Sequence, residues 1–102
     1  MPECAINTSD GVKVADVVWC SEERFAQIED EISASIAPEI CVEVKSSGNT
    51  VDEIEFKNNL YLEAQALEVW LCNKQGEMKF YNQQGELEQS LLVPNFPQQI
   101  KR

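Results

Sequence analysis

The sequence predicts an α/β fold with a central mixed β-sheet flanked by one or two α-helices. Valine-rich or alternating runs recur along the chain, which is typical of β-strands. A segment with helical spacing lies between two of these runs, and such a segment usually joins two parallel strands as a crossover. The last strand-like runs are separated only by short turns that contain glycine, which favours antiparallel pairing.

Length and composition indicate one domain. The chain has 102 residues, of which 43% are hydrophobic and 25% are charged. These values suit a single domain over residues 1–102, with a tail at 94–102 because Pro94 and Pro97 interrupt regular structure. No apolar run reaches the ~20 residues that span a bilayer, and residues 1–11 lack the basic and apolar regions of a signal peptide. We therefore expect a cytoplasmic location and no membrane partner.

In the N-terminal half, one strand and one helix are predicted. Residues 1–10 show no periodic pattern and are expected to form a loop or a frayed end. The alternating, valine-rich run 12–20 predicts the first strand. Ser21 is a candidate N-cap for a helix within residues 21–36, where apolar side chains recur at helical spacing. The Ala37–Pro38 step ends this pattern, because a residue before proline avoids the helical conformation.

In the C-terminal half, the pattern predicts one helix and four strands. The run 39–45 is the second strand of the chain, and a turn follows at 46–49. Thr50 and Glu53 form a capping box, so a helix begins here and continues to about Gln65. The remaining strands are expected at 67–72, 78–82 and 87–93.

The charge of the chain disfavours nucleic-acid binding. Eight basic residues stand against 18 acidic ones, for a formal net charge of −10, whereas phosphate binding depends on Lys and Arg. DNA is therefore a candidate partner that the global charge opposes.

The Cys and His content narrows the chemistry further. The chain contains no His, which excludes Ser-His and Cys-His nucleophilic catalysis. Its four cysteines include no CxxC pair, which argues against a zinc site. Three of them, Cys20, Cys41 and Cys72, lie in strand-like runs and are expected to act as small buried hydrophobic side chains.

Four charged residues occupy positions where core side chains are expected. Glu43 and Lys45 share one face of the second strand, and apolar neighbours indicate that both faces of this strand are covered. Asp16 lies among valines in the first strand. Lys57 falls near the centre of the apolar stripe of the helix, so its side chain is aimed toward the sheet. We therefore expect these four side chains to converge.

Such a convergence has a chemical use. Carboxylate oxygens suit Mg²⁺ or Mn²⁺, ions that keep several waters for a phosphate substrate. A nearby lysine can orient the nucleophile or neutralise charge that develops on the phosphate. Metal-dependent nucleases use this combination of groups. A purely structural ion-pair cluster explains the same residues, since a buried charge without a partner is costly, and spacing alone leaves both interpretations open.

The order of these motifs resembles the PD-(D/E)XK restriction-endonuclease-like superfamily, and within it the Uma-type family of endonucleases. The segments "VKVADVVWCS", "PEICVEVKSS", "EFKNNLY" and "ALEVWLCN" carry the resemblance, which covers roughly residues 12–82. No single motif is specific, but their order is. The resemblance implies a restriction-endonuclease-like core and a metal-dependent DNA endonuclease that uses Mg²⁺ or Mn²⁺.

The resemblance also implies roles for individual residues. Asp16 and Glu43 match the two metal-binding carboxylates, and the main-chain carbonyl of Val44 matches the usual extra metal ligand. Lys45 matches the lysine of the E-x-K motif. Lys57 matches the helix lysine that Uma-type members often use when the strand position is not lysine.

Three departures from the family pattern bear on function. Ala15 stands where a proline is expected, and the presence of both Lys45 and Lys57 is unusual for the Uma type. Relatives usually carry a helix and a strand before the Asp16 strand, whereas about ten residues precede it here. A shortened N-terminus would open a sheet edge, and open edges invite pairing with another chain. We therefore expect a homodimer, and we keep as an alternative function a non-catalytic interaction module that retains the nuclease fold.

Overall fold

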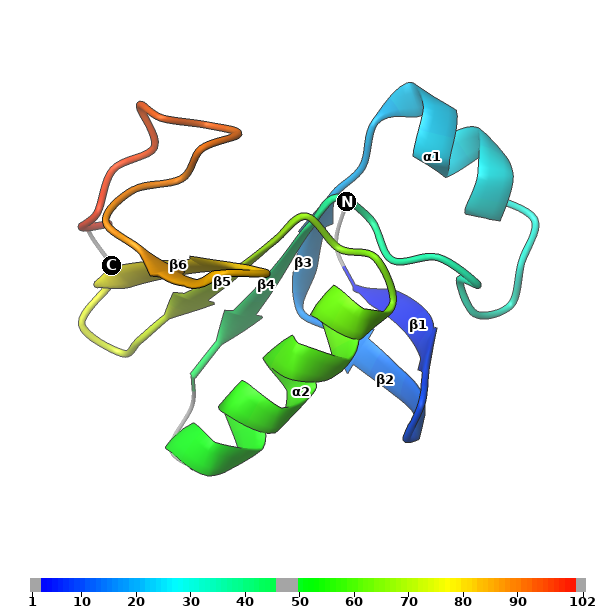
Figure 1. Ribbon diagram of the computed structural model, residues 1–102, viewed down its shortest axis with the longest axis horizontal. Helices are drawn as coiled ribbons and strands as arrows, with labels where there is room; N and C mark the ends of the chain where they lie inside the picture. Colours follow the sequence, from blue (N-terminus) through cyan, green and yellow to red (C-terminus); the bar gives the residue numbers. More distant parts are fainter. Residues whose placement is uncertain (1–2, 46–49, 101–102) are drawn as a thin grey trace.

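The computed structural model describes residues 3–45 and 50–100. Its elements in chain order are β1 (Cys4–Thr8), β2 (Gly11–Ala15), β3 (Val17–Trp19), α1 (Glu22–Ile28), β4 (Ile40–Val44), α2 (Val51–Glu63), β5 (Glu68–Cys72), β6 (Met78–Asn82) and β7 (Gly85–Leu87). Strands β1 and β2 form a two-stranded sheet, and the others form a five-stranded sheet in the order β3-β4-β5-β6-β7 (Figure 1). Neither helix in the described ranges is long and apolar enough to cross a membrane.

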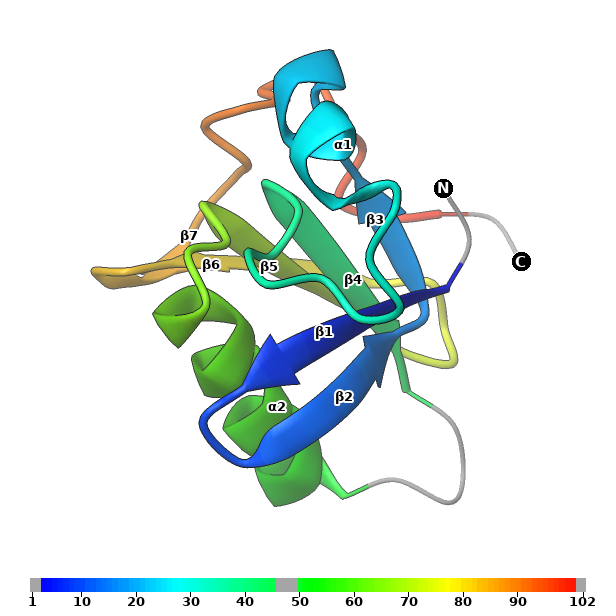
Figure 2. The same cartoon turned by 90° about the vertical axis from the view of Figure 1, so that its right-hand side faces the viewer.

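The five-stranded sheet is mixed, as the sequence predicts. β4 and β5 are parallel and α2 connects them, whereas the other neighbouring pairs are antiparallel. α2 begins after Thr50, whose side chain accepts a hydrogen bond from the backbone N–H of Glu53, which confirms the predicted cap. α2 and the β1-β2 hairpin lie on the same side of the sheet (Figure 2). Their apolar side chains close a core over this face, around Ile6, Tyr61 and Val69.

The strands β4, β5 and β6 lie within the predicted ranges 39–45, 67–72 and 78–82. The crossover between β4 and β5 and the antiparallel pairing of β5, β6 and β7 are also confirmed. The turn predicted at 46–49 lies outside the described residues.

Asp16 divides the predicted strand 12–20 into two strands. β2 pairs with β1 and β3 pairs with β4, so the chain passes from one sheet to the other at Asp16. The division has a cause in hydrogen bonding, because the backbone N–H and the carboxylate of Asp16 both bond to residues of β4. The loop expected at 1–10 is wrong, since β1 lies within it and pairs with β2.

The first helix is shorter than the sequence predicts. Its N-cap is Ser21, as expected, and the Ser21 hydroxyl accepts a hydrogen bond from the backbone N–H of Arg24. α1 ends at Ile28, so the second half of the range 21–36 is not helical. Ala34 lies there instead and exchanges backbone hydrogen bonds with β1, which accounts for the early end of the helix.

The strand predicted at 87–93 is also mostly absent, because β7 ends at Leu87. The carboxylate of Glu68, at the start of β5, accepts hydrogen bonds from the backbone N–H groups of Leu91 and Leu92 at 2.8 and 3.0 Å. In the register of the β6-β7 pair, these two residues would lie beyond Met78, the first residue of β6, and the N–H of Met78 donates instead to the carbonyl oxygen of Gln98 at 2.8 Å. The chain therefore leaves the meander after Leu87, and residues 88–100 are irregular.

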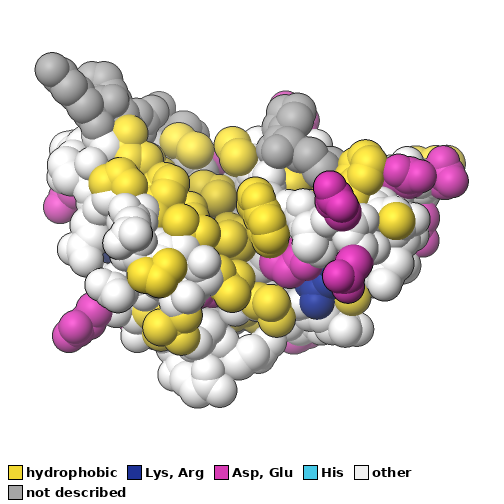
Figure 3. All heavy atoms as spheres, turned by 90° about the horizontal axis from the view of Figure 1, so that it is seen from above, with side chains coloured by type: hydrophobic (Ala, Val, Ile, Leu, Met, Phe, Trp, Pro, Cys, Tyr) yellow, Lys and Arg dark blue, Asp and Glu magenta, His cyan; other side chains and the backbone are white. Residues whose placement is uncertain are grey.

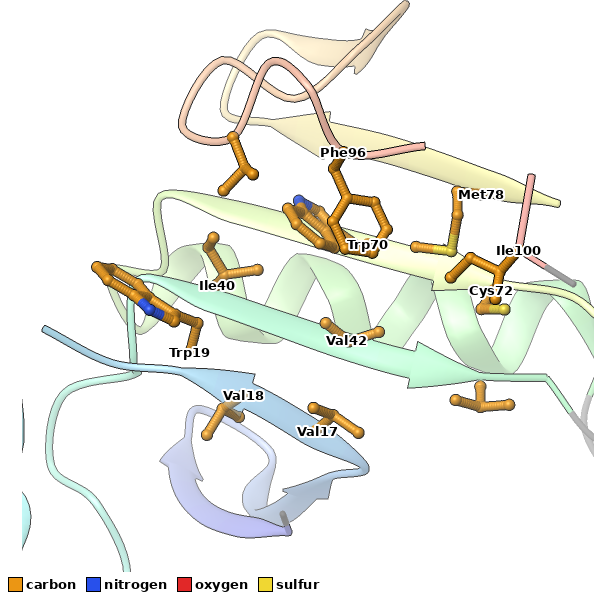
Figure 4. A pocket seen from close by; sticks show the side chains of 12 residues that line it. Val17, Val18, Trp19, Ile40, Val42, Trp70, Cys72, Met78, Phe96 and Ile100 are labelled. Carbon is orange, nitrogen blue, oxygen red and sulfur yellow. The ribbon is translucent and has the colours of Figure 1, made fainter. Parts of the chain in front are cut away.

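The face of the sheet opposite α2 carries no helix within the described residues. The irregular segment 88–100 packs over part of it, and the ring centroids of Trp70 and Phe96 lie 4.6 Å apart. An open apolar groove of about 570 Å³ remains beside this segment (Figures 3 and 4). Val17 and Trp19 line the groove and are 45% and 55% exposed. The expectation that both faces of β4 are covered therefore holds only in part, because Ile40 is buried on this face while Val42 and Val44 line the open groove.

The cysteines agree in part with the hydrophobic role predicted for them. Cys41 and Cys72 are buried free thiols, whereas Cys20 is a half-buried one. Burial raises the pKa of the Cys41 thiol, which keeps it protonated and apolar at neutral pH.

Candidate functional site

Glu43 forms the buried centre of the site. Because side chains alternate along β4, Glu43 faces α2 together with Cys41, while Val42 and Val44 face the apolar groove. Glu43 is 4% exposed. Burial raises the pKa of its carboxyl group, and the negative charge of Asp16 acts in the same direction, while the Lys57 ammonium opposes both. The net effect is a carboxyl group that holds its proton more tightly than an exposed glutamate.

Asp16 is locked against β4 by two hydrogen bonds. Its backbone N–H donates to Glu43 Oε2 at 3.1 Å, and its Oδ2 accepts from the backbone N–H of Val44 at 2.8 Å. Both bonds come from the junction of β2 and β3, where the chain changes sheets. The two carboxylates predicted to converge are therefore neighbours across this junction.

Lys57 reaches the same point from α2. Its Nζ lies 2.6 Å from Glu43 Oε1 and donates to the main-chain carbonyl oxygen of Val14 at 3.1 Å. The inward direction predicted for Lys57 is confirmed by its neighbours on the helix, because Ile54 and Tyr61 are buried against the sheet. A lysine at the centre of an apolar stripe thus meets a carboxylate at the centre of a core strand.

Tyr61 lies beneath this cluster, one turn after Lys57 on α2. It is fully buried, and its hydroxyl has no hydrogen-bond partner among the described residues. Burial raises the pKa of the hydroxyl, and the charges of Glu43 and Asp16 raise it further. The group is therefore a neutral phenol close to the two carboxylates.

Lys45 is the one predicted site residue that lies apart. It stands on the same face of β4 as Glu43, two residues further along, and lines a second groove with Asn58 and Lys79. In residues 3–45 and 50–100, its ammonium has no carboxylate within 4 Å. The structure thus brings Asp16, Glu43 and Lys57 together and leaves the Lys45 side chain outside that cluster.

The donor set suits a hard divalent cation. The N–H and C=O of one strand residue point to the same edge, so the Val44 carbonyl is directed to the edge where its N–H meets Asp16. Two carboxylates and one carbonyl are oxygen ligands of the kind that Mg²⁺ and Mn²⁺ accept, with water filling the other positions. In the described part of the chain, no group of three or more His, Cys, Asp or Glu side chains is placed to hold a metal ion.

The sequence interpretation missed three contributors near the site. The Val14 carbonyl holds Lys57, and Lys74 and Lys79 lie in the groove that Lys45 enters. A main-chain oxygen leaves no mark in a sequence pattern. The two lysines could have been singled out from the sequence, because the chain contains only eight basic residues.

Three features define a restriction-endonuclease-like α/β domain: a mixed sheet with a parallel pair, a crossover helix with an inward lysine, and an acid on β4 beside a second acid at the β2-β3 junction. Comparison with known proteins agrees. The sequence profile of the Uma2 family, described as "Putative restriction endonuclease", matches residues 2–101. The chain therefore belongs to the Uma2 family.

The fold is also similar to that of a solved structure, a "putative nuclease belonging to DUF820" from Anabaena variabilis ATCC 29413. The TM-score is 0.69 at 18% sequence identity, and the match covers 85% of this chain and 51% of the other. The chain thus spans about half the length of that protein. A search of curated protein sequences finds no match.

Proposed function

We propose that this protein is a metal-dependent endonuclease of the PD-(D/E)XK type, which hydrolyses phosphodiester bonds in DNA. The observation that carries the proposal is that Glu43 bonds both to the backbone N–H of Asp16 and to the Lys57 ammonium, which brings groups from the β2-β3 junction, β4 and α2 to one point. The membership in the Uma2 family supports it.

In the proposed reaction, Asp16, Glu43 and the Val44 carbonyl hold Mg²⁺ or Mn²⁺. The bound ion supplies Lewis acidity toward the phosphate and lowers the pKa of a water. Asp16 and Glu43 orient the ion because hydrogen bonds to β3 and β4 fix both carboxylates. Glu43 acts as a ligand only after it loses the proton that burial helps it to hold.

We assign the assisting lysine to Lys57 and not to Lys45. Lys57 Nζ is already within 2.6 Å of a proposed ligand oxygen. An ammonium there stabilises negative charge as it develops on the phosphate. The pair of bonds to Glu43 and to the Val14 carbonyl keeps it in place before substrate arrives.

Plasmid nicking tests the proposal. Pure protein with Mg²⁺ or Mn²⁺ is expected to convert supercoiled DNA to the open circle, and Asp16→Ala or Glu43→Ala to abolish this. Lys57→Met is expected to reduce the rate by about 100-fold, a typical loss for one electrostatic contact to a transition state. Glu88→Gln, an exposed acid outside the site, serves as the control. No nicking by the wild type, or equal nicking by Glu43→Ala, would refute the proposal.

A non-catalytic interaction module is the second candidate. One observation favours it, namely that protein groups alone already satisfy the Glu43 carboxylate, through the Lys57 ammonium and the backbone N–H of Asp16. Calorimetric titration with Mn²⁺ separates the two functions. Binding that disappears in Asp16→Ala supports the endonuclease, and the absence of binding supports the module.

A further inference from the structure

A second groove, which we call the lysine groove, lies beside the candidate metal site on the α2 face of the sheet. Its volume is about 410 Å³. Asn58 from α2 and Leu71 from β5 contribute to its lining. Its charged side chains among the described residues are three lysines and two acids, namely Lys45, Lys74, Lys79, Glu55 and Glu77. The groove thus forms where β4 and β5 end and the β5-β6 turn begins.

The strand register fixes the position of this groove relative to Glu43. Glu43 pairs with Leu71, and Leu71 pairs with Lys79, so the three residues form one row across the sheet. Paired residues share a face, and neighbouring strands lie about 4.8 Å apart, so the Lys79 backbone is roughly 10 Å from that of Glu43. Lys45 lies two residues beyond Glu43 on β4, or about 7 Å. The groove therefore begins next to the proposed metal ligands.

The lysines of the groove differ from the others in their charge partners. In the part of the chain that the structure describes, none of the three has a carboxylate within 4 Å. Lys13 and Lys57, in contrast, form ion pairs with Asp10 and Glu43. Three of the eight basic residues of a chain with a net charge of −10 are thus gathered at one place without a charge partner.

The wall of the groove also holds an unsatisfied polar group. Asn58 is 6% exposed, and its Oδ1 has no hydrogen-bond partner among the described residues. Buried polar atoms are nearly always paired with protein, water or ligand. A side-chain amide can turn either its oxygen or its NH₂ group toward a bound molecule. Asn58 thus places a polar atom, which has no partner in the described part of the protein, at the boundary between α2 and the lysines.

We propose that the lysine groove binds the phosphodiester backbone of a nucleic acid, on the phosphates next to the one that is cleaved. This inference rests on the proposed function. Rows of lysines bind phosphates as point charges and do so without regard to sequence. Its three lysines outnumber its two acids, so the groove carries a local excess of positive charge in an acidic protein, and it assigns Lys45 to substrate binding.

Fluorescence anisotropy tests the proposal with a labelled DNA duplex and a labelled single strand. Protein is titrated in EDTA at salt concentrations between about 50 and 200 mM, the range over which phosphate contacts weaken strongly. We expect the double variant Lys74→Gln/Lys79→Gln to bind at least one DNA form about tenfold more weakly, with a salt slope smaller by about 2. Both side chains are exposed, so the variant should fold, and circular dichroism checks this.

Lys13→Gln is the matched control, because Lys13 lies in the two-stranded sheet and pairs with Asp10 at 3.1 Å. It should leave affinity and salt slope unchanged. Equal binding by the wild type and the double variant would overturn the proposal, as would the absence of binding to both DNA forms. Lysine-dependent binding without nicking would refute only the endonuclease, and nicking that ignores the lysines would refute only the groove.

Discussion

At the scale of single residues, two effects act in opposite directions on the protonation of Glu43. Its burial stabilises the protonated form, whereas the ion pair with Lys57 and the proposed metal both need the carboxylate. A group whose folded pKa is raised makes the folded state bind more protons than the unfolded state. The free energy of unfolding then falls as pH rises, starting near the ordinary carboxyl pKa of 4.5.

Replacing Glu43 by Gln should remove this dependence. In EDTA, the free energy of unfolding of the wild type minus that of Glu43→Gln should decrease as pH rises from about 4.5 toward neutrality. The reason is that only the wild type has a titrating carboxyl group at position 43. Gln retains an oxygen for the Asp16 N–H, so the fold is preserved. Urea unfolding at several pH values measures the difference. The same comparison with Glu88→Gln should show no such trend. If the free energy of unfolding of the wild type minus that of Glu43→Gln rises with pH, the prediction is contradicted.

Residue geometry accounts for what the sequence could and could not foretell about the site. Strand alternation and the helical angle placed Glu43 and Lys57 on facing surfaces, and the structure agrees. Lys45 has the same parity as Glu43, and parity alone does not separate them. Lys45 differs from Glu43 in its distance along the chain. It shares a groove with Lys79, whose position across the sheet depends on strand register. Register between distant strands is not written in either strand's local pattern.

At the scale of elements, Glu68 anchors the irregular segment that follows β7. Its Oε1 accepts hydrogen bonds from the Trp70 indole N–H at 2.8 Å and from the Ser90 hydroxyl at 2.6 Å. Its Oε2 accepts from the N–H groups of Leu91 and Leu92. The buried carboxylate thus accepts from four donors, of which the three at residues 90–92 fasten the segment 88–100 to the sheet.

The expected cost of removing this charge is large. Glu68→Gln should lower the free energy of unfolding by about 2 kcal/mol, because charge-assisted hydrogen bonds contribute roughly 1.5–3 kcal/mol and one amide NH₂ would face donors. Urea denaturation measures it. Ser90→Ala removes a single donor and should cost less, about 1 kcal/mol. If Glu68→Gln costs no more than the exposed control Glu88→Gln, the segment is held by its apolar contacts and not by Glu68.

The element errors have separate causes. The run 87–93 has the apolar content of a strand, but its N–H groups are bound by an acid about 20 residues earlier. β1 was missed because its five residues show no strict alternation, and they form a strand through pairing with β2. β4, α2 and β6 were predicted well because their periodicity is visible in their own residues.

The homodimer expected from the sequence stays a prediction.

At the scale of the whole molecule, cations can stabilise the folded protein in two ways, by screening its net charge of −10 and by binding to a specific site. Any cation screens the repulsion among 18 acidic residues and so stabilises the folded state to some degree. A site at Asp16 and Glu43 adds a second contribution, because a ligand that binds only the folded state stabilises it by mass action. The two contributions differ in their response to ionic strength and to mutation.

Thermal unfolding with and without Mn²⁺ separates them at matched ionic strength. An ion at about 100 times its Kd adds about 2.7 kcal/mol to the free energy of unfolding, which is a rise in Tm of roughly 10 °C for a domain of this size. The wild type should show this rise over an equal ionic strength of NaCl, and EDTA should reverse it. Asp16→Asn removes one proposed ligand charge but leaves 17 acids, so only the screening part should remain. Equal rises in the two proteins would mean that Mn²⁺ acts on the charge of the whole surface and that the cluster of Asp16, Glu43 and Lys57 is a structural ion pair.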